Sequence, residues 1–275
     1  MFGTEPSDPA CKALELFQRE RVCKLLELGG GQGRDTIFFG QHGFQVTVLD
    51  YAESGVKEIA GKAAPLGLSE AITAVRHDVR DPLPFADASF DACYSHMLFC
   101  MALTTAELER LSRGVWRVLK PGGINIYTVR HTGDPQYGMG INRGDDTFES
   151  SGGFAVHFFS REKVRHLATG FDILSIDEFE EGALPRKLFR VTLRKKQREE
   201  SNAPPTQFEG VTVVDKGLFA SIPKALIREF FEFVGLDIAD FCSVNRWAAN
   251  SQDSSRQIPH YSDLRTLSDP WISAP

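Results

Sequence analysis

Short apolar runs alternate with helical patterns along residues 9–196 of this chain. Runs rich in β-branched residues predict strands, and segments with an apolar residue every three or four positions predict helices. Strands are predicted over 22–28, 44–49, 71–76, 90–94, 124–129, 171–179 and 187–194, and helices over 9–21, 35–42, 53–64, 105–119 and 160–168. This order favours an α/β fold: a doubly wound, mostly parallel seven-stranded sheet with helices on both faces and an antiparallel last strand.

Two parts of the chain break the alternation. Residues 131–156 are rich in Gly and Asp and lack periodicity, which predicts a long loop of functional or disordered character. After residue 198 the composition changes to that of a linker over 199–210, followed by an extension over 211–275. We expect an amphipathic helix near 222–234, which could join two copies of the chain, and a disordered end.

Composition narrows the classes of partner. The formal net charge of -6 disfavours a general binder of nucleic acid or anionic membranes. No apolar run reaches membrane-spanning length, and the five cysteines form no C-x-x-C pair. These features predict a cytoplasmic protein with reduced thiols and no zinc site.

The most informative segment follows the first predicted strand. Glu27 is followed by glycines at alternate positions, Gly29, Gly31 and Gly33, with Gly30 between them. A strand that ends in such a loop lets a ligand approach bare backbone, as nucleoside-containing cofactors do. The dinucleotide pattern G-x-G-x-x-G is absent here, and the Glu27 carboxylate would repel a pyrophosphate. A carboxylate at this position suits a ligand that carries a positive amine, and S-adenosylmethionine is such a ligand.

Several ordered motifs resemble one family. Glu27–Gly33 is similar to the first motif of the class I S-adenosylmethionine-dependent methyltransferases, and Arg34-Asp35 to its form in tellurite-resistance and thiopurine-type members. His77-Asp78-Val79, the run LPFADASFD over 83–91 and the run RVLKPGG over 117–123 resemble later motifs of small-molecule members, including methyltransferase types 11 and 25. The resemblance covers roughly residues 9–196 and implies a Rossmann-like class I methyltransferase fold.

The resemblance also implies roles for particular residues. Asp50, at the end of the second strand, would accept hydrogen bonds from both ribose hydroxyls, and Tyr51 would pack on the adenine. Asp78 would accept from the exocyclic amine of the adenine, and the Val79 backbone N–H would reach a ring nitrogen. Ser95 would lie where the backbone meets the methionyl part.

Methyl transfer is an in-line displacement, so the protein mainly holds nucleophile, carbon and sulfur in line. The acceptor would lie at the carboxyl ends of the fourth and fifth strands, where His96, Arg130 and His131 are candidates, with His157 from the loop. Arg130 could bind an anionic acceptor, and His131 or His157 could serve as general base. Each histidine could equally be a hydrogen-bonded structural residue. The spacing of His131, Asp134 and His157 is no known metal-ligand pattern, so no metal is expected.

Other interpretations stay open. A nicotinamide-dependent oxidoreductase would also need a glycine loop, although Glu27 and the glycine spacing argue against it. A further hypothesis is that the chain has the same fold but is a non-catalytic binding subunit. Residues 217–225 faintly resemble the start of a carboxymuconolactone-decarboxylase-like helical domain, and no activity carries over from that likeness. The sequence does not identify the acceptor atom.

Overall fold

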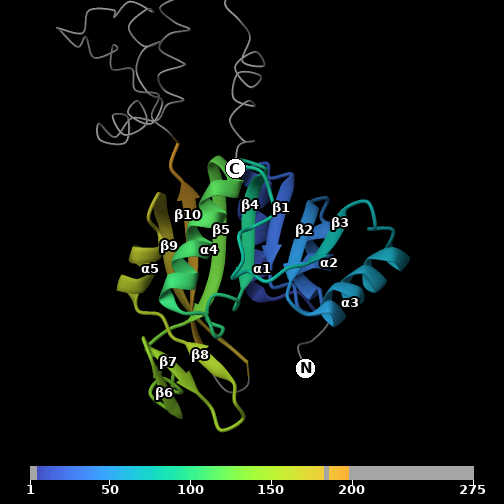
Figure 1. The fold of residues 1–275 in the computed structure, drawn as a ribbon. Helices are drawn as coiled ribbons and strands as arrows, with labels where there is room; N and C mark the ends of the chain where they lie inside the picture. Colours follow the sequence, from blue (N-terminus) through green and yellow to red (C-terminus); the bar gives the residue numbers. More distant parts are fainter. Residues whose placement is uncertain (1–4, 183–185, 198–275) are drawn as a thin grey trace, which may run out of the picture. The chain divides into compact units, whose positions relative to one another are not determined.

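The computed structural model describes residues 5–182 and 186–197 (Figure 1). The expected linker, extension and helix near 222–234 lie outside the described residues. Among the described residues, no helix has both the length and the apolar character that crossing a membrane requires. The elements in chain order are α1 (Asp8–Arg19), β1 (Lys24–Leu28), α2 (Arg34–Gln41), β2 (Gln45–Asp50), α3 (Glu53–Ala63), the 3-10 turn η1 (Ala64–Leu66), β3 (Ile72–Arg76), β4 (Phe90–His96), α4 (Thr105–Val118), β5 (Leu119–Arg130), β6 (Ile141–Gly144), β7 (Thr147–Glu149), β8 (Ala155–His157), α5 (Arg161–Leu167), β9 (Phe171–Glu181) and β10 (Arg186–Lys195).

The main sheet has seven strands in the order β3-β2-β1-β4-β5-β10-β9. The five strands β1 to β5 pair in parallel, and β10 lies antiparallel between β5 and β9. The expected doubly wound sheet with an antiparallel last strand is therefore confirmed. Because β9 runs in the same direction as β5, its last residues lie at the same edge of the sheet as the carboxyl ends of β1 to β5.

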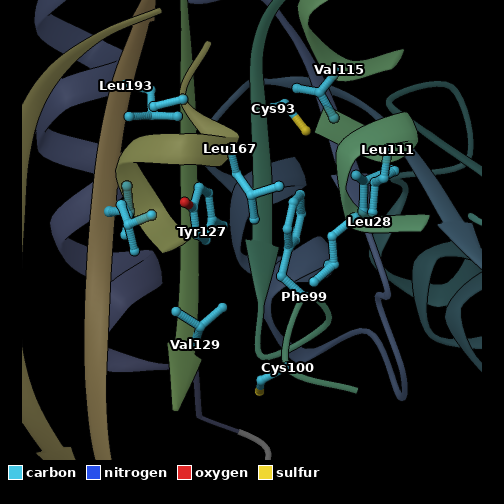
Figure 2. Close-up of a cluster of buried hydrophobic side chains, with 14 of the residues drawn as sticks. Leu28, Cys93, Phe99, Cys100, Leu111, Val115, Tyr127, Val129, Leu167 and Leu193 are labelled. Carbon is cyan, nitrogen blue, oxygen red and sulfur yellow. The ribbon is translucent and has the colours of Figure 1, made fainter. Parts of the chain in front are cut away.

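Each face of the sheet has its own hydrophobic core. Successive strand residues point to opposite faces, so Leu25 of β1 packs in the core under α1, α2 and α3, while Leu26 and Leu28 pack in the other, under α4 and α5. Figure 2 shows this second core, where Leu167 of α5 lies near Tyr127 of β5, and Leu111 and Val115 of α4 lie near Leu28 and Cys93. The Phe99 ring stacks on the Tyr127 ring with 4.7 Å between centroids. The two cores hold the carboxyl ends of the strands in one register.

The expectation of a loop over 131–156 is wrong in part. This segment carries the small antiparallel sheet β6-β7-β8, in which three or four residues form each strand. Strands this short carry no readable period, and the glycines and aspartates between them form the turns. Tyr137, Phe148 and Phe158 pack edge-on against one another and supply an apolar centre.

The start of β5 also differs from the expectation. β5 first pairs at Leu119 opposite Phe90, and pairing then resumes at Ile124 opposite Ala92. The residues between, which include Gly122 with a φ of 77°, bulge out of the ladder. The strand predicted over 124–129 is thus the longer part of a strand that begins at Leu119 and is interrupted after it.

Candidate functional site

The glycine loop lies between the carboxyl end of β1 and the start of α2. Gly31 and Gly33 have φ values of 55° and 82°, which side chains other than glycine rarely adopt. A Cβ on Gly30 would lie 2.4 Å from the Val48 Cγ2, and one on Gly33 would lie 2.6 Å from the Ile59 Cγ1. The loop therefore packs directly on β2 and α3, and a side chain at Gly30 or Gly33 would clash with them.

Asp50 ties this loop to the end of β2. Its Oδ2 accepts from the Gly31 N–H at 2.7 Å and its Oδ1 from the Ala52 N–H at 2.8 Å. Gly55 of α3 approaches so closely that a Cβ there would lie 2.6 Å from the Gly31 carbonyl oxygen. Tyr51, beside Asp50, is 66% exposed. A carboxylate with lone pairs to spare thus lies next to an uncovered aromatic ring, as a nucleoside would require.

The third motif lies at the end of β3, next to Asp50. The His77 N–H donates to the Asp50 carbonyl oxygen at 2.9 Å, which places Asp78 and Val79 beside the end of β2. Arg80 donates to both Asp78 oxygens and lowers the pKa of that carboxyl to about 2. Asp78 is thus charged at neutral pH and half-buried at the same edge as the glycine loop.

Beneath the loop lies a pair of buried carboxyl groups. Glu27 and Asp35 are each 4% exposed. Asp35, in the first turn of α2, accepts from the Ser7 N–H at 2.8 Å, from the Ser7 hydroxyl at 2.7 Å and from the Tyr94 hydroxyl at 3.2 Å. Glu27 has no such set of donors, because its Oε2 has no hydrogen-bond partner among the described residues. Burial is the main cause that raises the pKa of Glu27 to about 8, and the negative charge of Asp35 raises it further.

The end of β4 carries Ser95 and His96 to the same edge. Ser95 is fully buried, and its Oγ has no hydrogen-bond partner among the described residues. The His96 Nδ1 lies 2.9 Å from the Thr128 Oγ1 of β5, and its Nε2 lies 3.3 Å from the Glu181 Oε1 of β9. Met97 follows with a φ of 61°, and its N–H donates to the Thr128 Oγ1 at 3.0 Å. Such backbone strain is typical of functional sites.

Glu181 and Thr128 were missed by the sequence reasoning. His96 lowers the pKa of the Glu181 carboxyl, and Arg34 in the first turn of α2, 3.7 Å from its Oε1, lowers it further. Glu181 therefore connects the end of β9 to both β4 and the glycine loop. The acidic run at the end of the sixth predicted strand was a weak signal for it, and Thr128 carried none.

Arg130 and His131 do not join this group. The Arg130 guanidinium donates to both Asp134 oxygens and to the Gln136 Oε1 at 2.9 Å, and it lies over the Phe158 ring. The His131 ring stacks on Phe189 at 4.4 Å, its Nδ1 accepts from a backbone N–H, and burial lowers its pKa. Both side chains hold the chain between β5 and the small sheet, and the Arg130 donors are already used.

His157 is also enclosed. Its Nδ1 donates to the Leu103 carbonyl oxygen at 2.7 Å, and the Lys163 ammonium donates to its Nε2 at 2.6 Å. Burial lowers the pKa of this imidazole, and the nearby Lys163 charge lowers it further. The ring is fully buried, so the geometry leaves no nitrogen for a substrate. Among the described residues, no three His, Cys, Asp or Glu side chains are arranged to hold a metal ion.

Comparison with known proteins agrees with this arrangement. Residues 25–123 match the family of methyltransferase domains. An uncharacterized methyltransferase of Synechocystis is 34% identical over 101 residues, which is 37% of this chain and 44% of the relative. The chain spans about half, or less, of the length of the curated relatives it matches.

Solved structures share the fold at low sequence identity. An S-adenosylmethionine-dependent methyltransferase from Methanosarcina mazei superposes with a TM-score of 0.57 at 20% identity, covering 63% of this chain and 92% of that one. A Burkholderia thailandensis 1,6-didemethyltoxoflavin-N1-methyltransferase, solved with that compound and S-adenosylhomocysteine, has a TM-score of 0.56 at 20% identity, covering 69% and 78%. Residues 25–123 thus resemble methyltransferase domains, and the strand order is that of the Rossmann-like class I methyltransferase fold, for which S-adenosylmethionine is the matching cofactor.

Proposed function

We propose that this protein transfers the methyl group of S-adenosylmethionine to a small-molecule acceptor by in-line displacement. The observation that carries the proposal is the Asp50 carboxylate, fixed by the Gly31 and Ala52 amides at the mouth of the glycine loop. The cofactor, when bound, supplies a methyl group already activated by positive sulfur. The protein then binds the cofactor and the acceptor, aligns the acceptor atom with the methyl carbon and the sulfur, and takes up the proton that the acceptor loses.

The residues fit each part of this cofactor. Asp50 keeps lone pairs for the two ribose hydroxyls, and exposed Tyr51 offers a face for the adenine. Asp78 would accept a hydrogen bond from the adenine amine, and the Val79 N–H would donate one to a ring nitrogen. Gly31 has open space at its Cβ position, and Gly29, Gly30 and Gly33 let the loop pack closely enough on its neighbours to take up the methionyl part, with Glu27 beneath the loop and Ser95 at the end of β4.

We propose His96 as general base for an acceptor that carries a proton. It lies at the carboxyl end of β4, and its two ring nitrogens face Thr128 and Glu181. The Nε2 makes no hydrogen bond among the described residues, so it is the nitrogen that could accept a proton, and the Glu181 carboxylate beside it would stabilise the positive ring that forms. Arg130, His131 and His157 support the site by packing, since Arg130 pairs with Asp134, the His131 ring stacks on Phe189 and both nitrogens of His157 are hydrogen-bonded.

Further proposals concern the whole chain. We propose a methyltransferase domain over 1–198, a linker over 199–210 and a C-terminal extension over 211–275 that could join two copies of the chain. The four cysteines of the described residues are free thiols, which favours the cytoplasm. We propose no nucleic-acid or membrane partner, because the chain is net acidic.

Calorimetry with S-adenosylhomocysteine tests the cofactor site. Wild-type protein should bind it, and Asp50→Ala should lose most of the affinity, because the ribose contact and the loop anchor go together. Asp172→Ala, at the exposed start of β9, is the matched control and should bind like the wild type. Absence of binding, or full affinity in Asp50→Ala, would contradict the proposal.

A screen with methyl-labelled cofactor against metabolite pools then tests the reaction. Label in a small acceptor supports methyl transfer. Tight cofactor binding without transfer to any fraction would favour a non-catalytic binding subunit. Binding of NADH with no affinity for S-adenosylhomocysteine would favour an oxidoreductase.

A further inference from the structure

Glu27 occupies an unusual position for a carboxyl group. It lies on β1, one residue before the strand ends, and only 4% of its surface is exposed. Its Oε2 has no hydrogen-bond partner among the described residues. An ionised carboxylate in such a place needs a cation or several donors, because desolvation costs several kcal/mol.

The groups around Glu27 do not supply that compensation. Asp35 faces it from α2 and Asp50 from β2, and both favour its uncharged form. From β4, the Cys93 thiol and Tyr94 hydroxyl are buried beside it and add no positive charge. The Thr36 hydroxyl of α2 favours the ionised form, but less strongly than burial and Asp35 oppose it.

The Arg34 guanidinium, in the first turn of α2, faces other carboxylates. The Arg34 Nε lies 3.6 Å from the Asp35 Oδ1, and its Nη2 lies 3.7 Å from the Glu181 Oε1. Asp35 is further satisfied by Ser7 and Tyr94. The two buried carboxyl groups therefore differ: Asp35 accepts three hydrogen bonds, whereas the Glu27 Oε2 accepts none among the described residues.

We propose that Glu27 is protonated in the free protein and releases its proton to solvent when the cofactor's ammonium group binds beside it. This inference rests on the proposed function, because it requires the methionyl part to lie over the glycine loop. The step balances: the O–H bond of the Glu27 carboxyl breaks, its proton passes to the buffer, and the remaining carboxylate pairs with the ammonium. The site then discriminates for a cationic cofactor, since a ligand without the amine leaves Glu27 uncharged.

The pKa of Glu27, raised to about 8, determines how many protons are released when the cofactor binds and how the affinity depends on pH. At pH 7 the carboxyl is then mostly protonated, and pairing with a cation in a low-dielectric site should bring its pKa to below about 6, so that it is ionised in the complex. Binding should therefore release about 0.9 proton per cofactor at pH 7. Affinity should rise by about tenfold per pH unit below pH ~8 and level off above it.

Calorimetry of the full chain with S-adenosylhomocysteine measures this directly. The binding enthalpy is recorded at pH 7 in phosphate and in Tris, whose ionisation enthalpies differ, and the difference gives the number of protons released. Glu27→Gln cannot ionise and should show no release and no rise in affinity between pH 6 and 8. Glu162→Gln, the same change at the exposed start of α5, should behave like the wild type.

A second ligand keeps the test independent of the variant's folding. 5′-Deoxy-5′-methylthioadenosine carries the adenosine and sulfur but no amino-acid part, so its binding to wild-type protein should release no proton. Equal enthalpies of S-adenosylhomocysteine binding in the two buffers, or equal release with methylthioadenosine, would overturn the inference and leave the proposed function standing. Failure of wild-type protein to bind S-adenosylhomocysteine would overturn both.

Discussion

The His96 Nε2 lies 3.3 Å from the Glu181 Oε1, which joins the end of β4 to the end of β9. The Nδ1 of the same ring lies 2.9 Å from the Thr128 Oγ1 of β5. The Nδ1 is thus hydrogen-bonded to β5, whereas the Nε2 faces the β9 carboxylate without a hydrogen bond among the described residues. Among the histidines predicted as candidates, this ring is the one that faces a carboxylate at the cofactor edge.

Replacement of His96 tests its role as base. His96→Ala should lower methyl transfer by about 10²-fold while S-adenosylhomocysteine affinity changes little, because general-base catalysis acts on the acceptor. Glu181→Gln should cause a smaller loss and shift the pH profile of the rate. Transfer of labelled methyl to the acceptor fraction measures both. His42→Ala, at the exposed end of α2, is the control, and an unchanged rate in His96→Ala would remove His96 from the mechanism.

Two glycines on α3 provide a matched test of the loop packing. Gly55→Ala would place a Cβ 2.6 Å from the Gly31 carbonyl oxygen, so it should lower the free energy of unfolding by about 1–3 kcal/mol and weaken cofactor binding. Gly61→Ala, with nothing within 4 Å of its Cβ, should raise the free energy of unfolding by about 0.5–1 kcal/mol. Urea denaturation and calorimetry measure the two effects. Similar behaviour of the two variants would argue against the close approach.

The pH dependence of stability offers a test of Glu27 without any ligand. The pKa of this carboxyl is raised to about 8 in the folded protein, above its value of about 4.3 in an unfolded chain. Between these values the folded state binds the proton more readily, so this group's contribution to stability is full below pH ~4 and is lost as the pH rises through 8. Relative to wild type, Glu27→Gln should therefore gain stability as pH increases from 5 to 8, measured by thermal unfolding.

His157 should contribute with the opposite sign in the same range. Its pKa is lowered by burial, so the unfolded chain binds the proton more readily and stability falls as the pH drops below about 6.5. His157→Gln should therefore lose less stability than wild type between pH 7.5 and 5.5. Parallel curves for the two proteins would show that this ring is not held neutral by its surroundings.

Replacement of Arg130 tests whether its ion pair with Asp134 stabilises the fold. The side chain of Asp134 is fully buried, so Arg130→Met should lower the free energy of unfolding by about 3–5 kcal/mol by leaving that carboxylate without its cation. Lys57→Met removes one partner of an exposed ion pair with Glu53 on α3 and should cost less than about 0.5 kcal/mol. Denaturant unfolding compares the two. A stable Arg130→Met variant would return the guanidinium to consideration as an acceptor ligand.

The order of strands and helices could be predicted from the sequence, because each main element has a readable period and ends at a glycine, proline or cap. The glycine loop, Glu27, Asp50 and Asp78 were also found this way, since they lie in consecutive motifs at predicted strand ends. The small sheet β6-β7-β8 was not predicted, because strands of three or four residues have no readable period and depend on pairing with their partner strands.

The sequence by itself determined the fold class and the segments proposed to bind the cofactor. Tertiary structure decided which polar side chains are available for chemistry. Arg130 and His157 looked as suitable as His96 until Asp134 and Lys163 were found beside them, and Glu181 gained significance when β9 brought it to His96. The reason is physical: residue type sets what a side chain can do, but its burial and charge partners are contributed by strands and helices far away in the chain.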